Sequence, residues 1–160
     1  MRSPVRDGRS TDTATRQCYL PPMDHRRVSI RIHCIFSTKD RQPTIPEDLQ
    51  QRLWEFIGGI TRRLGMKAIA VGGIEDHAHV LLLLSPTIPL ATAVQKIKAN
   101  SSRWLHEMTG RPFQWQEGYA AYSVSISQTD ATVRYILNQR EHHRRRTFDE
   151  EMAAILEKVA

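Results

Sequence analysis

The sequence has little of what marks secreted and membrane proteins. Only two of its 160 residues are cysteine, too few for a disulfide framework, and a reducing compartment is therefore expected. The densest apolar run, Leu81 to Leu84, is far shorter than the roughly 20 residues that cross a bilayer. The first 23 residues are polar and do not resemble a secretory signal. We therefore expect a cytoplasmic protein with no membrane segment.

Acidic residues are also in short supply. The chain has 17 Asp and Glu against 23 Lys and Arg, a net charge of +6, and a pI near 9.7. The densest basic segment holds Arg134, Arg140 and the run 144–146, with Glu141 as its only acid. Basic proteins tend to bind polyanions, and nucleic acid is the leading candidate. The alternative is a solvated helix face without a ligand.

The length suits one domain of ordinary size. Residues 1–22 are rich in Arg, Ser, Thr, Asp and Pro and show no periodicity, which predicts a disordered extension. Patterned sequence begins at Met23, a candidate start codon, so residues 23–160 form the predicted domain.

Hydrophobic periodicity predicts the order of the elements in that domain. Strands are expected at 28–36, 66–71, 77–84 and within 113–125, with a turn or bulge at Gly72-Gly73. Helices are expected at 47–64, 90–108 and 130–143, and a capping box at 147–150 opens a short last helix. This order predicts an α+β fold: a ferredoxin-like antiparallel sheet with helices on one face and a C-terminal helical extension carrying a tyrosine.

Two histidines, His77 and His79, stand at positions i and i+2 of the strand predicted at 77–84. A strand turns such residues to the same face. Neutral imidazole is the commonest metal ligand in proteins, so the pair could form half of a metal site. Asp76 and Glu75 precede the pair, and either carboxylate could accept a hydrogen bond from one ring nitrogen and so leave the other nitrogen free for a metal. The alternative is structural, with one histidine bound to a polar core group and the other solvated.

Tyr135 and Gln139 are four residues apart in the predicted helix 130–143 and share one of its faces. The amide oxygen of Gln139 suits Mg²⁺ or Mn²⁺ and would complete a set of three neutral ligands with His77 and His79. Tyr135 would then lie near the ion, where a phenol can attack a phosphodiester once its proton is removed. A tyrosine at the edge of a packed helix is otherwise an ordinary interface residue.

Several segments together resemble a known family. His77-Ala78-His79 matches the HUH motif, and residues 135–139 match the tyrosine motif of the single-tyrosine transposases of bacterial insertion sequences. Further similar segments occur in the same order at 34–39, 72–77, 100–104, 115–119, 122–125 and 138–143. The resemblance covers residues 26–152 and is specific as an ordered set.

This resemblance implies a homodimer that acts on single-stranded DNA with hairpin ends. By position, His77, His79 and Gln139 would bind Mg²⁺ or Mn²⁺, and Tyr135 would be the nucleophile. The family cleaves DNA to a 5′-phosphotyrosine and a free 3′-hydroxyl, and then transfers the strand. The resemblance also implies composite sites, in which the histidines of one subunit work with the tyrosine helix of the other. The sequence alone does not determine whether the tyrosine acts in its own subunit or in the partner.

Two other functions remain as alternatives: a domesticated relative that processes repetitive extragenic hairpins, and a non-catalytic DNA-binding regulator. Eight basic side chains are weaker candidates for contact with DNA phosphates. They are Lys39, Arg41, Lys96, Lys98, Arg103, Arg140, Arg144 and Arg145. Trp104 and Trp115 are predicted to belong to the core. His142-His143 is interpreted as a surface helix end near phosphates, because adjacent helical residues do not share a face.

Overall fold

The computed structural model describes residues 28–143, 147, 150, 152–154 and 157. The predicted extension 1–22, Arg144 and Arg145 lie outside the described residues. The strands are β1 (Ile30–Ser37), β2 (Lys67–Gly73), β3 (His77–Leu84) and β4 (Ala120–Ser123). The helices are η1 (Lys39–Arg41), α1 (Glu47–Arg63), α2 (Leu90–Thr109), η2 (Ile126–Gln128), α3 (Thr129–Leu137) and α4 (Gln139–His143).

The described strands form one antiparallel sheet in the order β2-β3-β1-β4. β3 and β1 are central, and β2 and β4 are the edges. This order, with α1 after β1 and α2 after β3, confirms the predicted ferredoxin-like α+β fold. Because β3 is paired on both sides, its side chains are held more rigidly than those of an edge strand.

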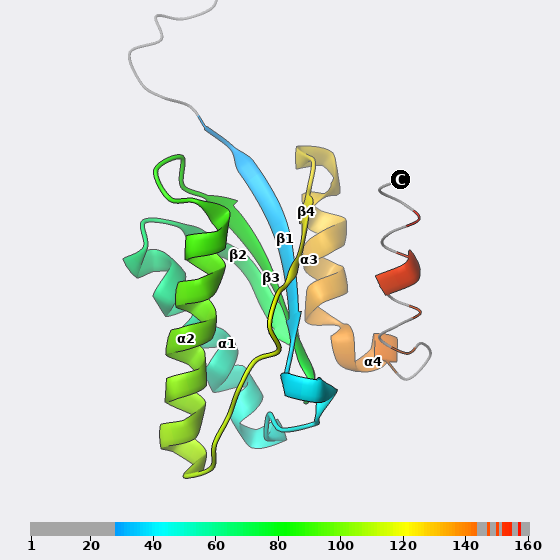
Figure 1. The fold of residues 1–160 in the computed structure, drawn as a ribbon. Coiled ribbons are helices and arrows are strands. Elements are labelled where there is room, and N and C mark those ends of the chain that lie inside the picture. The colour runs from blue at the N-terminus through cyan, green and yellow to red at the C-terminus, as the bar shows by residue number, and fades with distance from the viewer. Residues whose placement is uncertain (1–27, 144–146, 148–149, 151, 155–156, 158–160) are drawn as a thin grey trace, which may run out of the picture.

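α1 and α2 cover one face of the sheet (Figure 1). Their apolar stripes pack against Cys34 and Phe36 of β1 and against Val80 and Leu82 of β3. Trp115 belongs to this core, and Trp104 packs against it, stacked on Phe56, as predicted. This layer contains the main hydrophobic core.

α3 lies on the opposite face (Figure 1). Its Ile136 is fully buried against Ala70 of β2 and Leu81 of β3. Gly72 permits this contact, because a Cβ atom built at Gly72 would lie 2.4 Å from the carbonyl oxygen of Ile136. The C-terminal extension therefore covers the face that α1 and α2 leave open.

Three predicted boundaries were wrong. Gly72 and Gly73 continue β2, and the irregularity of this strand lies between Ala68 and Ala70. β1 begins at Ile30, two residues after the predicted start. The predicted helix 130–143 is broken at Asn138, whose φ of −101° and ψ of 23° leave the helical range.

The capping box at the start of the last predicted helix is confirmed. The Thr147 N–H donates to the Glu150 carboxylate, and the Glu150 N–H donates back to the Thr147 hydroxyl. None of the helices in the described part of the chain has the length and apolar character that a bilayer span requires.

Candidate active site

The site begins on β3, where strand alternation turns His77, His79 and Leu81 toward α3. His77 and His79 are fully buried, and their ring centroids are 4.9 Å apart. Ala78, Val80 and Leu82 point the other way into the main core. The predicted same-face pair is therefore present, at the boundary between the sheet and the C-terminal extension.

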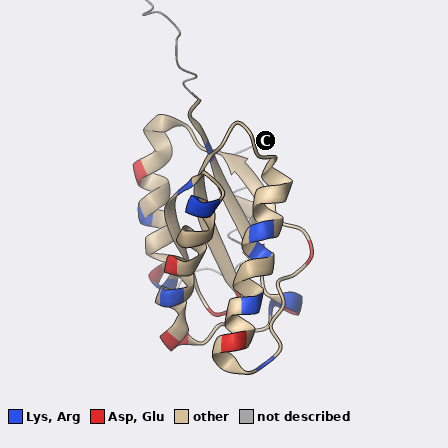
Figure 2. Ribbon diagram, turned by 90° about the vertical axis from the view of Figure 1, so that its left-hand side faces the viewer, with Lys and Arg blue, Asp and Glu red and all other residues tan. Residues whose placement is uncertain are grey.

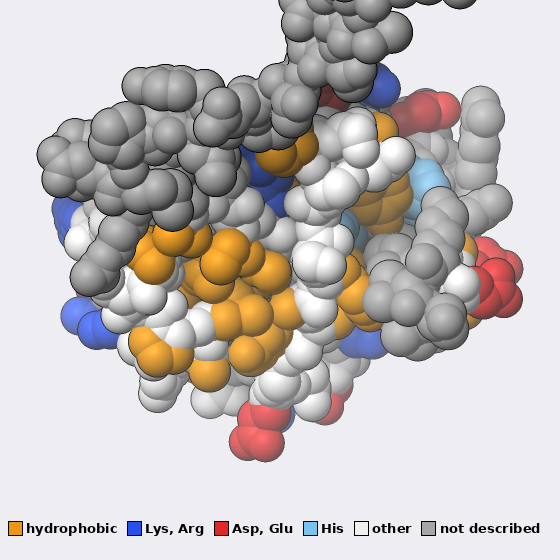
Figure 3. Space-filling model, turned by 90° about the horizontal axis from the view of Figure 1, so that it is seen from above, with side chains coloured by type: hydrophobic (Ala, Val, Ile, Leu, Met, Phe, Trp, Pro, Cys, Tyr) orange, Lys and Arg blue, Asp and Glu red, His pale blue; other side chains and the backbone are white. Residues whose placement is uncertain are grey.

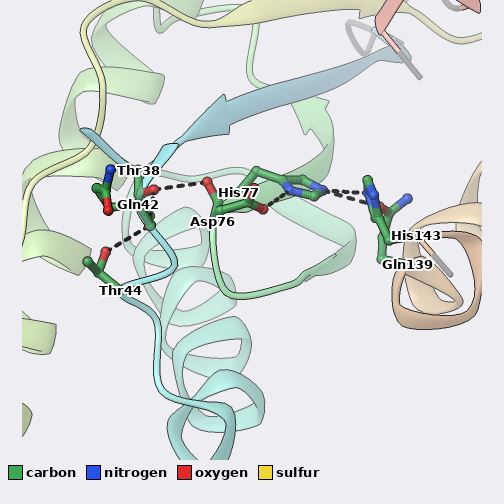
Figure 4. A network of polar contacts seen from close by, with 7 residues as sticks. All are labelled: Thr38, Gln42, Thr44, Asp76, His77, Gln139 and His143. Carbon is green, nitrogen blue, oxygen red and sulfur yellow. Dashed lines mark hydrogen bonds and ion pairs between the residues drawn. The ribbon is translucent and has the colours of Figure 1, made fainter. Parts of the chain in front are cut away.

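Asp76 orients His77 from behind, as Figure 4 shows. The Asp76 Oδ1 and His77 Nδ1 atoms are 2.6 Å apart. An ionised carboxylate only accepts hydrogen bonds, so Nδ1 carries a proton, and Nε2 is the nitrogen that has a lone pair when the ring is neutral. Burial would raise the pKa of Asp76, but the hydrogen bond from His77 and nearby positive charges, including Arg41, lower it overall.

His33 of β1 performs a similar task for His79 and was missed by the sequence analysis. Its Nε2 lies 2.9 Å from His79 Nδ1, and the two rings stack with centroids 5.1 Å apart. The register pairs His33 with Leu81 and Ile35 with His79, which makes His33 and His79 diagonal neighbours on one face. Burial lowers the pKa of His33 to about 4 and that of His79 well below its usual value.

Tyr135 packs its ring over these two imidazoles. Its centroid is 5.6 Å from that of His79, 6.1 Å from that of His33 and 5.1 Å from that of His142. Its hydroxyl is buried and has no hydrogen-bond partner among the described residues. Figure 3 shows histidine side chains reaching the surface beside hydrophobic ones on the α3 side. The predicted nucleophile thus lies against the histidines of its own chain.

Gln139 faces His77 despite the helix break at Asn138. Its Nε2 donates to the Tyr135 carbonyl at 3.3 Å, which turns Oε1 toward His77 Nε2, also 3.3 Å away. His143 joins them, with Nε2 at 3.1 Å from Gln139 Oε1 and 3.2 Å from His77 Nε2. His143 is half-buried and contacts two of the candidate ligands, which the sequence analysis did not predict.

This donor set fits a divalent cation. Gln139 Oε1 and the Nε2 atom of a neutral His77 ring both present lone pairs, which a divalent cation can bind. Within the described part of the chain, no three His, Cys, Asp or Glu side chains form a metal cluster. An ion at this place therefore needs the amide oxygen of Gln139 among its ligands.

Other predicted site residues are placed differently. Glu75 is exposed, and its carbonyl accepts a hydrogen bond from the Ile45 N–H, so its carboxylate does not support the histidines. Lys39 and Arg41 lie in η1, directly after β1. Thr38, just before them, donates its N–H to the Asp76 carbonyl at 2.8 Å, and Arg41 lies close enough to Asp76 to lower the pKa of its carboxyl. Lys39 instead lines a cavity with Lys98 of α2 and Gln114.

The cations of α2 lie on the opposite face of the sheet from the histidines. Lys and Arg residues are spread along both helices of this face (Figure 2). Lys96 and Arg103 are exposed there, whereas Lys98 donates to the Gln116 and Gly118 carbonyls at 2.5 and 2.8 Å. Arg140 of α4 bonds to Glu47 and Gln50 of α1. The side chains of Lys98 and Arg140 therefore already have partners within the protein.

The comparisons with known proteins identify a family for the chain. The family model described as "Transposase IS200 like" matches residues 26–139, a range that contains His77, His79, Tyr135 and Gln139. No curated protein matches the chain significantly.

Two solved structures share the fold. A "putative transposase" from Deinococcus radiodurans R1 is 21% identical, with a TM-score of 0.60 over 75% of this chain and 98% of that one. A REP-associated tyrosine transposase bound to a REP hairpin is 16% identical, with a TM-score of 0.55 over 75% of this chain and 73% of that one. Because the family model spans most of the chain, the protein belongs to the IS200-like transposase family.

Proposed function

We propose that this transposase is a metal-dependent single-strand DNA endonuclease and strand transferase with Tyr135 as its nucleophile. The observation that supports this most directly is the position of Tyr135, whose ring packs on His79 while Gln139, one turn later, faces His77. The nucleophile and the candidate ligands thus converge within one chain.

In the proposed reaction, the Tyr135 oxygen attacks a DNA phosphorus. A phosphotyrosine bond forms on the 5′ side as the bond to the 3′ oxygen breaks, and the phenol proton leaves. The ester bond is conserved, so a free 3′-hydroxyl can later attack the phosphotyrosine and release the tyrosine without ATP. Tyrosine's ordinary pKa is near 10, so a base must take the proton during attack.

The candidate cofactor is Mg²⁺ or Mn²⁺, held by His77, His79 and Gln139. Such an ion, when bound by neutral ligands, keeps its full charge and stabilises the negative charge that develops on the phosphate. The chain's own residues prepare the ligands: Asp76 fixes the His77 tautomer, and His33 orients His79.

The proposed substrate is single-stranded DNA with hairpin ends, met in the cytoplasm. Support comes from the structural relative that binds a REP hairpin and from the net charge of +6. Arg41, beside Asp76, is the best placed of the predicted phosphate contacts. A homodimer, implied by the sequence resemblance, would give one cleavage site per subunit and allow two DNA ends to be cut together.

Incubation with hairpin-bearing single-stranded DNA and Mn²⁺ tests this function. The wild type should form a covalent protein–DNA species that survives denaturing electrophoresis, and Tyr135→Phe should form none. Tyr119→Phe is the matched control, since Tyr119 is an exposed tyrosine outside the site. If the wild type forms no adduct, the chain is a DNA-binding regulator instead. If Tyr135→Phe forms as much adduct as the wild type, Tyr135 is not the nucleophile.

The hairpin-bound relative also favours a second candidate, a domesticated enzyme that processes repetitive extragenic hairpins. The same site chemistry would serve both functions. The DNA around the gene distinguishes them: flanking hairpin ends define a mobile element, whereas scattered single repeats define a domesticated one.

A further inference from the structure

The position of His143 extends the site beyond the ligands predicted from the sequence. His143 Nε2, Gln139 Oε1 and His77 Nε2 form a nearly equilateral triangle, with sides of 3.1, 3.2 and 3.3 Å. Figure 4 shows the His77 ring between Asp76 on one side and Gln139 and His143 on the other. Three atoms that can act as metal donors therefore lie together, His143 Nε2 among them when its ring is protonated at Nδ1 alone.

The spacing of this triangle matches that of metal ligands. Ligands about 2.0–2.1 Å from an ion are about 2.9 Å apart at octahedral right angles and about 3.4 Å apart at tetrahedral angles. The three observed distances fall between these limits. The atoms are already as close together as a coordinated ion would hold them, so binding would need little rearrangement.

The helix geometry explains why His143 and not its neighbour is in this place. Gln139 and His143 are four residues apart in α4, so they share one face and point together at His77. His142 is turned about 100° away, and its ring packs on Tyr135 instead. The adjacent histidines therefore have separate surroundings.

We propose that His143 is a further metal ligand, so that α4 supplies two donors, Gln139 and His143, to an ion that His77 of β3 also binds. This inference rests on the proposed metal-dependent function. It also implies a preference for the metal. Imidazole suits first-row transition ions and Mg²⁺ prefers oxygen, so an additional imidazole favours Mn²⁺ over Mg²⁺.

Mn²⁺ and Mg²⁺ titration of the purified full chain tests the proposal. His143→Phe keeps a ring without a donor and should raise the Kd for Mn²⁺ at least 10-fold while changing that for Mg²⁺ less. His143→Gln restores an oxygen donor and should recover part of the Mn²⁺ affinity. The matched control is His106→Phe on α2, on the other face of the sheet, and its Mn²⁺ affinity should equal that of the wild type.

Electron spin echo spectroscopy of bound Mn²⁺ counts the coordinated imidazoles directly. The wild type should show one imidazole nitrogen more than His143→Phe, with both proteins folded by circular dichroism. If His77→Ala abolishes Mn²⁺ binding but His143→Phe changes neither affinity nor spectrum, His143 is not a ligand and the proposed function stands. If the wild type binds neither ion, or His77→Ala binds as well as the wild type, the proposed metal site itself is wrong.

Discussion

At the scale of single residues, removal of the Tyr135 hydroxyl should abolish the proposed reaction without destabilising the fold. It is buried without a hydrogen-bond partner among the described residues, and an unsatisfied buried hydroxyl stabilises nothing. Tyr135→Phe should therefore leave the free energy of unfolding unchanged or raise it by up to about 1 kcal/mol, while it abolishes the DNA adduct. Chemical denaturation measures the first effect. A destabilisation above about 1 kcal/mol would mean that the hydroxyl has a structural role.

In the proposed metal site, Asp76 would act on the ion through its hydrogen bond with His77 and not by contact with the ion. Asp76→Asn replaces the acceptor of the His77 Nδ1–H bond with an amide that can also donate, so the ring can adopt the wrong tautomer. Loss of such a supporting partner typically weakens metal binding about 10–100-fold, and we expect this change in the Kd for Mn²⁺ by calorimetry. Asp40→Asn is the control, because Asp40 is an exposed residue of η1. Equal Kd values for the two variants would contradict a role for Asp76.

At the scale of elements, the site depends on how closely α3 approaches β2. Gly72 is paired directly with His79 across β2 and β3, so its missing side chain leaves room above His79 for α3. A Cβ at this position would meet the backbone oxygen of Ile136 at 2.4 Å, and a backbone atom cannot rotate away. The residue after Tyr135 is therefore packed directly on the sheet.

Gly72→Ala should push α3 outward, with a loss of about 1–3 kcal/mol in the free energy of unfolding and a lower adduct yield, because Tyr135 moves with the helix. Gly59→Ala is the matched control, since its nearest neighbour is the flexible Arg62 side chain at 3.8 Å. In the interior of α1 this change should stabilise by up to about 1 kcal/mol. Thermal melts and adduct assays measure both, and a Gly72→Ala protein as stable as the wild type would refute the close approach.

The elements also show what the sequence could and could not predict. Strand and helix periods correctly paired His77 with His79 and Tyr135 with Gln139, because both periods are local. His33 was missed because its contact with His79 depends on the register between β1 and β3, which local pattern does not determine. The contact between His143 and His77 was not predicted, because the sequence does not show which of two adjacent histidines points into the site. Only the fold shows that His143 does. Gly72 suggested a turn, since the approach of α3 cannot be inferred from the strand itself.

At the scale of the whole molecule, the buried histidines should make the metal-free protein sensitive to acid. The pKa of His33 is about 4 in the folded state against 6.5 ordinarily, so the unfolded chain binds more protons between these values. Stability is therefore full above about pH 6.5 and falls as the pH drops toward 4, by about 3 kcal/mol for this residue.

Denaturation in EDTA at a series of pH values measures this loss. His33→Gln keeps an acceptor for His79 but does not titrate, so its stability should fall less steeply over the same range. Parallel curves for wild type and variant would mean that His33 is protonated in the folded protein.

The arrangement of the whole chain also predicts which subunit supplies the tyrosine. The Tyr135 ring contacts His33 and His79 of its own chain, and Gly72 lets α3 lie directly on the strands that carry them. A site complete within one chain contrasts with the composite site that the sequence resemblance implies. A mixture of His77→Ala and Tyr135→Phe chains would then contain no intact site, whereas tyrosine exchange between subunits would create one. We expect the mixture to form no more DNA adduct than the two variants separately, and adduct at a substantial fraction of the wild-type level would show that the tyrosine acts on its partner.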